Sequence, residues 1–165
     1  YINGKGRKII GWDEILEGGL APNAAVMSWR GEAGGIEAAK QHHYVVMTPG
    51  SHCYLDHYQA DPASQPQAIG GFTTLEKIYN YEPVPAVLSA EEAKYIMGAQ
   101  GNVWTEWMPT PSHVEYMVYP RAAALAEVVW SPKEGRDYAN FNERMRSQIL
   151  RYNAYGINYC RIEFQ

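Results

Sequence analysis

Four short apolar runs, separated by segments of helical pattern, constrain the fold of this 165-residue chain most strongly. The runs cover residues 8–12, 24–29, 44–48 and 96–104, and none shows the strict polar–apolar alternation of a half-exposed strand. Strands that are covered on both faces, as in parallel sheets, have this nearly continuous apolar character. Because helical patterns follow the strands, the sequence predicts an α/β fold built on a parallel sheet.

Helix signals lie between and after these runs. We expect a short helix over residues 35–43, and capping boxes that start at Thr73 and Ser89 predict two further helix starts. A last helix is expected to end near Gly156, because four large residues recur at helical spacing before it. These residues are Phe141, Met145, Ile149 and Tyr152.

A longer helix is expected from a cap at Ser112 to about Trp130, with a kink at Pro120. Its apolar stripe contains one charged residue, Arg121. The stripe consists of Val114, Met117, Val118, Arg121, Leu125, Val128 and Val129. The segment 50–72, rich in Pro, Gln, Ser and Gly, is expected to be a long loop, and long loops inside compact domains tend to be functional.

Each expected strand ends in aromatic and acidic residues. In parallel α/β folds the carboxyl ends of the strands form the functional face, so these residues should gather at one rim. In extended backbone, residues two apart face the same way. This applies to the pairs Tyr54/Asp56 and Trp104/Glu106. Indole rings pack on the C–H faces of sugars and carboxylates accept from sugar hydroxyls, so the set indicates a carbohydrate site. Its members are Trp12, Trp29, Tyr54, Asp56, Trp104 and Glu106.

Structural roles remain open for the same residues. The chain has five Trp and thirteen Tyr, and some of these rings must pack in the core. The structural alternative for Asp56 and Glu106 is an ion pair with nearby Arg or Lys side chains. Glu127, inside an apolar helix, is better explained as a buried structural carboxylate than as a ligand contact.

Five ordered motifs resemble the family-20 glycoside hydrolases, the β-N-acetylhexosaminidases, over essentially the whole chain. The motifs are Gly11-Trp12-Asp13-Glu14, Ser28-Trp29-Arg30-Gly31, Tyr54-Leu55-Asp56, Trp104-Thr105-Glu106, and Tyr119-Pro120-Arg121 through Glu127-Val128-Val129-Trp130. The resemblance implies a (β/α)8 TIM-type barrel of which residues 1–165 form only the C-terminal half, about strands five to eight with their helices. A complete barrel of this type needs about 250 residues.

The resemblance also implies roles for the candidate residues. In this family the acetamido oxygen of the substrate attacks the anomeric carbon, so no enzyme carboxylate acts as nucleophile. Tyr54 matches the residue that stabilises the transition state by donating to that oxygen. Trp12, Trp29 and Trp104 match the walls around the acetamido methyl group. Asp56 and Glu106 match the carboxylates that accept from the hydroxyls of a terminal N-acetylglucosamine or N-acetylgalactosamine.

The acid/base pair of the family, an Asp-Glu dyad preceded by a His and two glycines, has no counterpart in this chain. Asp13 and Glu14 follow Gly-Trp instead, and they are expected to be solvated or salt-bridging carboxylates. The dyad is therefore expected upstream of Tyr1, and the isolated chain is expected to be inactive. Two rival functions are a non-catalytic carbohydrate-binding module and a barrel glycosidase of another family.

Composition excludes other classes. A net charge of −4 argues against nucleic acid as a partner, and no apolar stretch is long enough for a membrane span. The five histidines lack metal-site spacing, so we expect neither metal nor cofactor, and Cys53 and Cys160 are expected to be free, partly buried thiols.

The expected half-barrel has consequences for the origin of the chain and for its association with other chains. The chain opens on Tyr1 without a signal peptide, so we expect it to be cut from a longer protein, and the resemblance implies a periplasmic, cell-surface or secreted location. A cut barrel leaves unpaired strand edges and an exposed apolar interior, so we also expect self-association or pairing with the missing half.

Overall fold

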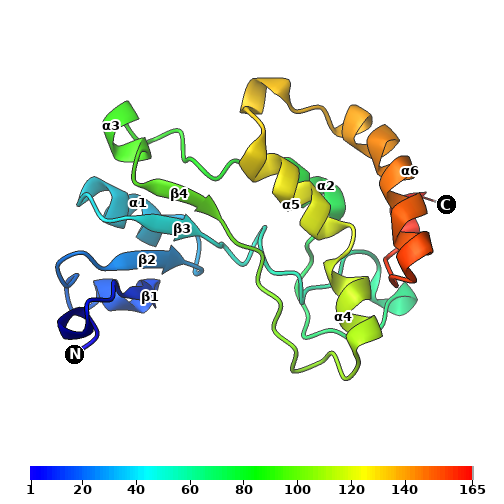
Figure 1. Cartoon of the computed structure of the whole chain (residues 1–165), viewed down its shortest axis with the longest axis horizontal. Coiled ribbons are helices and arrows are strands. Elements are labelled where there is room, and N and C mark those ends of the chain that lie inside the picture. The colour runs from blue at the N-terminus through cyan, green and yellow to red at the C-terminus, as the bar shows by residue number, and fades with distance from the viewer. Residues whose placement is uncertain (165) are drawn as a thin grey trace. The chain divides into compact units, whose positions relative to one another are not determined.

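The computed structural model describes residues 1–164 and divides them into two compact units. The first unit comprises Tyr1–Gly50 and Glu82–Gln100, and the second comprises Ser51–Tyr81 together with the chain from Gly101 onwards. Figure 1 shows the helices and strands in chain order.

The first unit is built on a parallel four-stranded sheet in the order β1-β2-β3-β4. The strands are β1 (Ile10–Trp12), β2 (Ala25–Ser28), β3 (Val45–Met47) and β4 (Ile96–Ala99). Each falls within one of the four apolar runs, which confirms the predicted α/β fold with a parallel sheet. The helices of this unit are α1 (Ala33–Lys40) and α3 (Ala90–Ala93).

One face of this sheet is covered by α1. The close approach depends on Gly35, where a Cβ atom would lie 2.5 Å from Sδ of Met47 and 3.1 Å from Cβ of Ser28. Val26, Ser28, Val45 and Met47 are buried on this side, whereas the alternate residues Ala25, Met27 and Val46 are only half-buried. Within the described residues, the nearly continuous apolar character of the runs therefore does not correspond to equal burial of the two faces.

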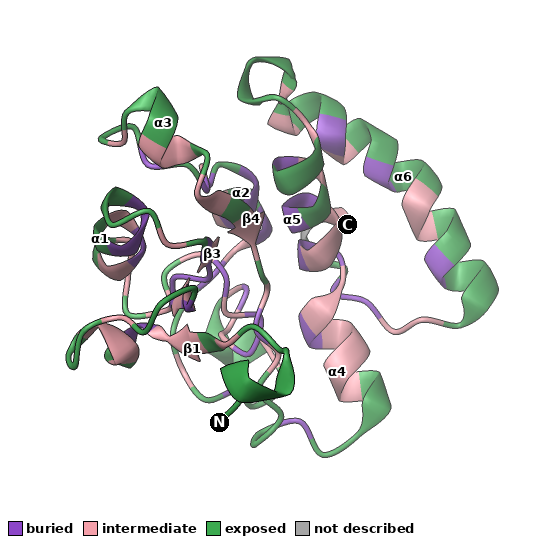
Figure 2. Ribbon diagram, turned by 60° about the vertical axis from the view of Figure 1, so that its left-hand side comes forward, coloured by how far each residue is buried: buried purple, intermediate pink, exposed green. Residues whose placement is uncertain are grey.

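The second unit is mainly helical. It contains α2 (Leu75–Tyr79), α4 (Pro111–Val118), α5 (Arg121–Trp130) and α6 (Tyr138–Tyr155), and α2 packs against α5. Figure 2 shows buried residues at intervals along α6. Phe141 of α6 packs against Tyr79, with ring centroids 4.8 Å apart and ring planes tilted by 33°. Short 3-10 turns at Asn3–Lys5, Asp13–Leu16, Pro62–Ser64, Lys133–Gly135 and Ile162–Phe164 complete the described chain.

Two of the predicted helix ends are confirmed. Ser89 forms the expected capping box with Glu92 at the start of α3, and α6 ends at Gly156, whose φ of 69° is the left-handed conformation that glycine adopts readily. The helix predicted over residues 35–43 forms slightly earlier, as α1.

Two other helix predictions are wrong. The cap of α2 is Thr74, which accepts from the backbone N–H of Lys77, and not Thr73. The long helix expected from Ser112 is two helices, because the chain leaves helical geometry at Tyr119 and Pro120 has no N–H to continue the ladder. The first of these helices is capped by Thr110, with Pro111 in its first turn.

Candidate functional site

A pocket of about 330 Å³ opens on the second unit. Four of its six lining residues were predicted from the sequence as sugar-site residues: Tyr54, Asp56, Trp104 and Glu106. The other two are His57 and Ile69, which sequence analysis missed and which, like Tyr54 and Asp56, come from the segment 50–72. The two remaining predicted residues, Trp12 and Trp29, belong to the first unit.

Backbone pairing brings the two halves of the pocket lining together. Tyr54 forms a parallel bridge with Asn102, and the N–H of Leu55 donates to the carbonyl of Asn102 at 2.8 Å. This pairing places the segment after Tyr54 beside the segment that leads to Trp104. Asp56 and Glu106 lie in turns and not in extended backbone. The extended geometry expected for the pairs Tyr54/Asp56 and Trp104/Glu106 is therefore not observed, although all four residues line the pocket.

Asp56 is the buried acid of this pocket. It is only 4% exposed, and among the described residues its Oδ1 has no hydrogen-bond partner. Burial raises the pKa of Asp56 to about 6, and the smaller opposing influences are its own backbone N–H and the charge of Arg121. Since a buried carboxylate oxygen without a donor is costly, this oxygen is available to a ligand that brings one.

Arg121 fixes the main chain around Asp56. It is fully buried, and its guanidinium makes five hydrogen bonds to backbone carbonyls, which uses all of its donors. Burial lowers its pKa to about 10, so it remains charged at neutral pH. The acceptors are the carbonyl oxygens of Leu55, His57, Thr73 and Met117. Arg121 stood out in the sequence as the one charged residue of the apolar stripe and as part of the motif Tyr119-Pro120-Arg121, but neither signal predicted this role.

His57 packs against the ring of Tyr54, with centroids 5.4 Å apart, and its Nδ1 lies 3.1 Å from Oγ1 of Thr73. Burial lowers the pKa of His57, and the positive charges of Arg121 and Lys77 act in the same direction. The imidazole is therefore neutral at neutral pH and supports the aromatic ring beside the pocket.

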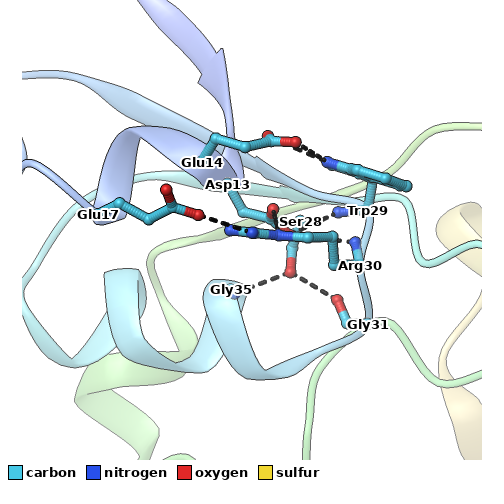
Figure 3. A network of polar contacts seen from close by, with 8 residues as sticks. All are labelled: Asp13, Glu14, Glu17, Ser28, Trp29, Arg30, Gly31 and Gly35. Atoms are coloured by element: carbon cyan, nitrogen blue, oxygen red, sulfur yellow. Dashed lines mark hydrogen bonds and ion pairs between the residues drawn. The ribbon is translucent and has the colours of Figure 1, made fainter.

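In the first unit, Asp13 and Glu14 bind Trp29 and its neighbour (Figure 3). Oδ2 of Asp13 accepts from the backbone N–H groups of Trp29 and Arg30, at 3.0 and 3.1 Å, and Oδ1 pairs with Nε of Arg30 at 2.6 Å. The carboxylate of Glu14 accepts from the indole Nε1 of Trp29 at 3.0 and 3.1 Å. The predicted salt-bridging role of Asp13 is confirmed, but Asp13 is buried at 2% exposure, so the alternative of a solvated carboxylate is wrong for it.

Other candidate groups have structural partners. Glu127 accepts from the hydroxyl of Tyr79 at 2.7 Å and from Nη2 of Arg144 at 2.6 Å, which agrees with the structural role expected for it. Neither Cys53 nor Cys160 forms a disulfide within the described residues, as predicted, and both are buried rather than partly buried. Within residues 1–164, no three His, Cys, Asp or Glu side chains are grouped so that they could hold a metal ion. None of the described helices has the length and apolar character of a membrane span.

A pocket lined by aromatic rings and carboxylates is suited to a sugar, because the rings pack on its C–H faces and the carboxylates accept from its hydroxyls. The sequence model described as glycosyl hydrolase family 20, catalytic domain, matches residues 1–133, and the chain belongs to this family. Membership sets aside the alternative of a glycosidase from another family.

Known relatives agree with this assignment. A β-hexosaminidase of Porphyromonas gingivalis is 52% identical over 93% of the chain, and one of Akkermansia muciniphila is 36% identical over 81% of it. A solved exo-β-N-acetylglucosaminidase of Vibrio harveyi, in complex with N-acetylglucosamine, superimposes with a TM-score of 0.87 at 31% identity over 99% of the chain. The chain spans only 20%, 27% and 26% of these three proteins, respectively.

Proposed function

We propose that residues 1–165 are the C-terminal half of one catalytic barrel in a β-N-acetylhexosaminidase, with β1–β4 as strands five to eight of the (β/α)8 fold. Four parallel strands in sequential order support this proposal, because a TIM barrel has the same connectivity throughout. The half-buried face with Ala25, Met27 and Val46 supports it as well, since the interior of a complete barrel would cover these side chains.

The substrate of this enzyme is a terminal β-linked N-acetylglucosamine or N-acetylgalactosamine. The observation that carries this proposal is the pocket in which Asp56 keeps a buried oxygen without a partner among the described residues. A sugar hydroxyl supplies the missing donor, and Glu106 at the same pocket accepts from a further hydroxyl. Trp104 provides an apolar surface for the sugar ring.

The reaction is substrate-assisted and retains the configuration of the anomeric carbon. The acetamido oxygen attacks that carbon and forms an oxazolinium ion, while the hydroxyl of Tyr54 donates to this oxygen and stabilises the transition state. Trp12, Trp29 and Trp104 exclude water from the acetamido group. The Asp-Glu dyad that protonates the leaving group and orients the acetamido nitrogen comes from the part of the barrel outside this chain.

The proposal is tested on the full-length protein that contains this chain, with a chromogenic N-acetyl-β-glucosaminide as substrate. We expect turnover, and Asp56→Ala should raise KM by about tenfold or more, because a carboxylate that accepts from sugar hydroxyls is lost. Glu91→Gln is the control, since Glu91 is exposed and pairs only with Lys94 in the described contacts. If the full-length protein binds N-acetylglucosamine without hydrolysing any such substrate, it is a carbohydrate-binding module.

A further inference from the structure

The proposed reaction does not use the Asp13-Glu14 pair of the first sequence motif. Its carboxylates are already occupied by protein donors, because Asp13 accepts from Trp29 and Arg30 and Glu14 accepts from the indole of Trp29. Carboxylates filled in this way are poorly suited to proton transfer with a substrate. Both adjacent residues instead contact Trp29, one at its main chain and the other at its ring (Figure 3).

We infer that Glu14 is a positioning residue that fixes the indole plane of Trp29, while Asp13 fixes the main chain from which that indole projects. The inference rests on the proposed function, in which Trp29 is one wall of the acetamido pocket. It goes beyond that function because it assigns a task to a carboxylate that does not touch the substrate.

The geometry supports this assignment in two steps. Trp29 follows the carboxyl end of β2, and its carbonyl still accepts from the N–H of Gly50 at 2.9 Å. Asp13 adds a second restraint on this segment, because it accepts from the N–H groups of Trp29 and Arg30. The ring still has two rotatable bonds, χ1 and χ2. Glu14 removes this freedom, because both of its carboxylate oxygens lie within 3.1 Å of the indole Nε1.

Glu14 is itself held in place by its neighbour. It belongs to the turn Asp13–Leu16, which starts directly after β1, and Asp13 anchors this turn from a buried position. The indole bond, ahead of the backbone N–H of Glu14 itself, lowers the pKa of the Glu14 carboxyl. The charged acceptor is therefore present throughout the neutral and mildly acidic range, and a charged acceptor binds an N–H more strongly than a neutral one does.

Glu17 offers a matched control on the same surface. It is an exposed carboxylate beside the same turn, and it pairs with Nη1 of Arg30 at 2.8 Å rather than with Trp29. A change at Glu17 therefore removes a similar charge from a similar place and leaves the indole contact intact.

The experiment is a double-mutant cycle in the full-length enzyme, measured with the chromogenic N-acetyl-β-glucosaminide. Glu14→Ala should lower kcat/KM by about three- to tenfold, and Glu14→Gln should lower it less because its amide oxygen still accepts. Trp29→Phe keeps an aromatic wall but has no N–H donor. In the Trp29→Phe background, Glu14→Ala should therefore change kcat/KM by less than about twofold. Glu17→Ala should leave kcat/KM unchanged in both backgrounds.

A second readout separates the contact from the activity. In enzyme labelled with 5-fluorotryptophan, the ¹⁹F resonance of Trp29 is assigned by its loss in Trp29→Phe. It should shift in Glu14→Ala and stay in place in Glu17→Ala. Independent effects of Glu14→Ala and Trp29→Phe on kcat/KM, or an unchanged resonance in Glu14→Ala, would overturn the inference. A shifted resonance with unchanged activity in both Glu14→Ala and Trp29→Phe would support the contact and instead overturn the assignment of Trp29 to the sugar pocket.

Discussion

Arg121 holds the main chain on both sides of Asp56. Its Nη2 donates to the carbonyl of Leu55 at 2.6 Å, and its Nη1 donates to the carbonyl of His57 at 3.0 Å. The buried acid of the pocket thus lies between two backbone positions that one guanidinium fixes. The same guanidinium brings a positive charge that lowers the pKa of Asp56 and so counteracts part of the effect of burial.

The first prediction concerns the stability that Arg121 provides. Arg121→Lys loses at least two of five donors, so the free energy of unfolding should fall by about 2–4 kcal/mol. Arg121→Leu leaves four buried carbonyls without a donor and should cost more than about 4 kcal/mol. Denaturant unfolding of the full-length protein measures both. The control is Arg146→Leu, an exposed residue paired with Glu143, which should change stability by less than about 0.5 kcal/mol.

The second prediction concerns Tyr54. If its hydroxyl donates to the acetamido oxygen, Tyr54→Phe should slow turnover by about ten- to a hundredfold, because a hydrogen bond to a charged group is worth about 1.5–3 kcal/mol. The loss should appear in kcat, since the bond strengthens as the oxazolinium forms. Tyr155→Phe, at a residue that is 81% exposed, serves as the control. Wild-type kcat in Tyr54→Phe would show that Tyr54 only packs.

The third prediction uses the raised pKa of Asp56, about 6 in the folded protein against an ordinary value of 3.8. Between these two values the folded state binds the proton more tightly than the unfolded state does, so the stability that Asp56 contributes below pH 4 is lost as the pH rises through about 6. Asp56→Asn should therefore raise the free energy of unfolding by about 2–3 kcal/mol at pH 7.5 and by little at pH 4.

The same substitution should weaken activity while it raises stability, because the amide cannot replace a carboxylate that accepts from sugar hydroxyls. Thermal unfolding at the two pH values and KM at pH 7.5 are the measurements. Glu106→Gln, at an exposed side chain of the same pocket, should leave stability nearly unchanged. Equal stabilisation by Asp56→Asn at both pH values would contradict the linkage to proton binding.

A fourth prediction is that the chain alone does not hydrolyse N-acetyl-β-glucosaminides. General acid catalysis alone contributes about 10²–10⁴-fold, and the proposed dyad lies outside the chain. Purified residues 1–165 should show no turnover above that of the buffer. Activity that disappears on Asp13→Asn or Glu14→Gln would instead make these residues the catalytic pair.

A fifth prediction is that the isolated chain associates. β1 and β4 are the two edges of the sheet, and Ile10 and Met97 on them are 49% and 66% exposed. Unpaired edges with apolar side chains favour pairing with another chain. Light scattering should show oligomers whose mass increases with concentration, and a stable monomer at high concentration would count against the half-barrel proposal.

The sequence predicts the strands well because each is an apolar run between turn residues, which is a local property. It also predicts four of the side chains that line the pocket of the second unit, because they come in the segments that follow β3 and β4. The burial of Asp13 was not predictable in this way, because its donors lie 16 and 17 residues further along the chain and only the fold brings them to the carboxylate.

Helix boundaries depend on which of several neighbouring residues caps the helix. Thr110, and not the predicted Ser112, caps α4, because Pro111 directly after Thr110 is well suited to the first turn of a helix. The role of Arg121 depends on carbonyls from three separate segments around residues 55–57, 73 and 117, and no local pattern encodes such a set.

The contacts of Arg121 involve main-chain oxygens alone, and this has a consequence for protein engineering. Leu55, His57, Thr73 and Met117 are recognised by their carbonyl groups and not by their side chains. Ile69, an exposed residue at the rim of the pocket, takes no part in these bonds and can be varied in a library while the path of the backbone is retained. His57 is kept, because its ring packs against Tyr54. Selection from such a library can search for altered glycan preference without rebuilding the scaffold beneath it.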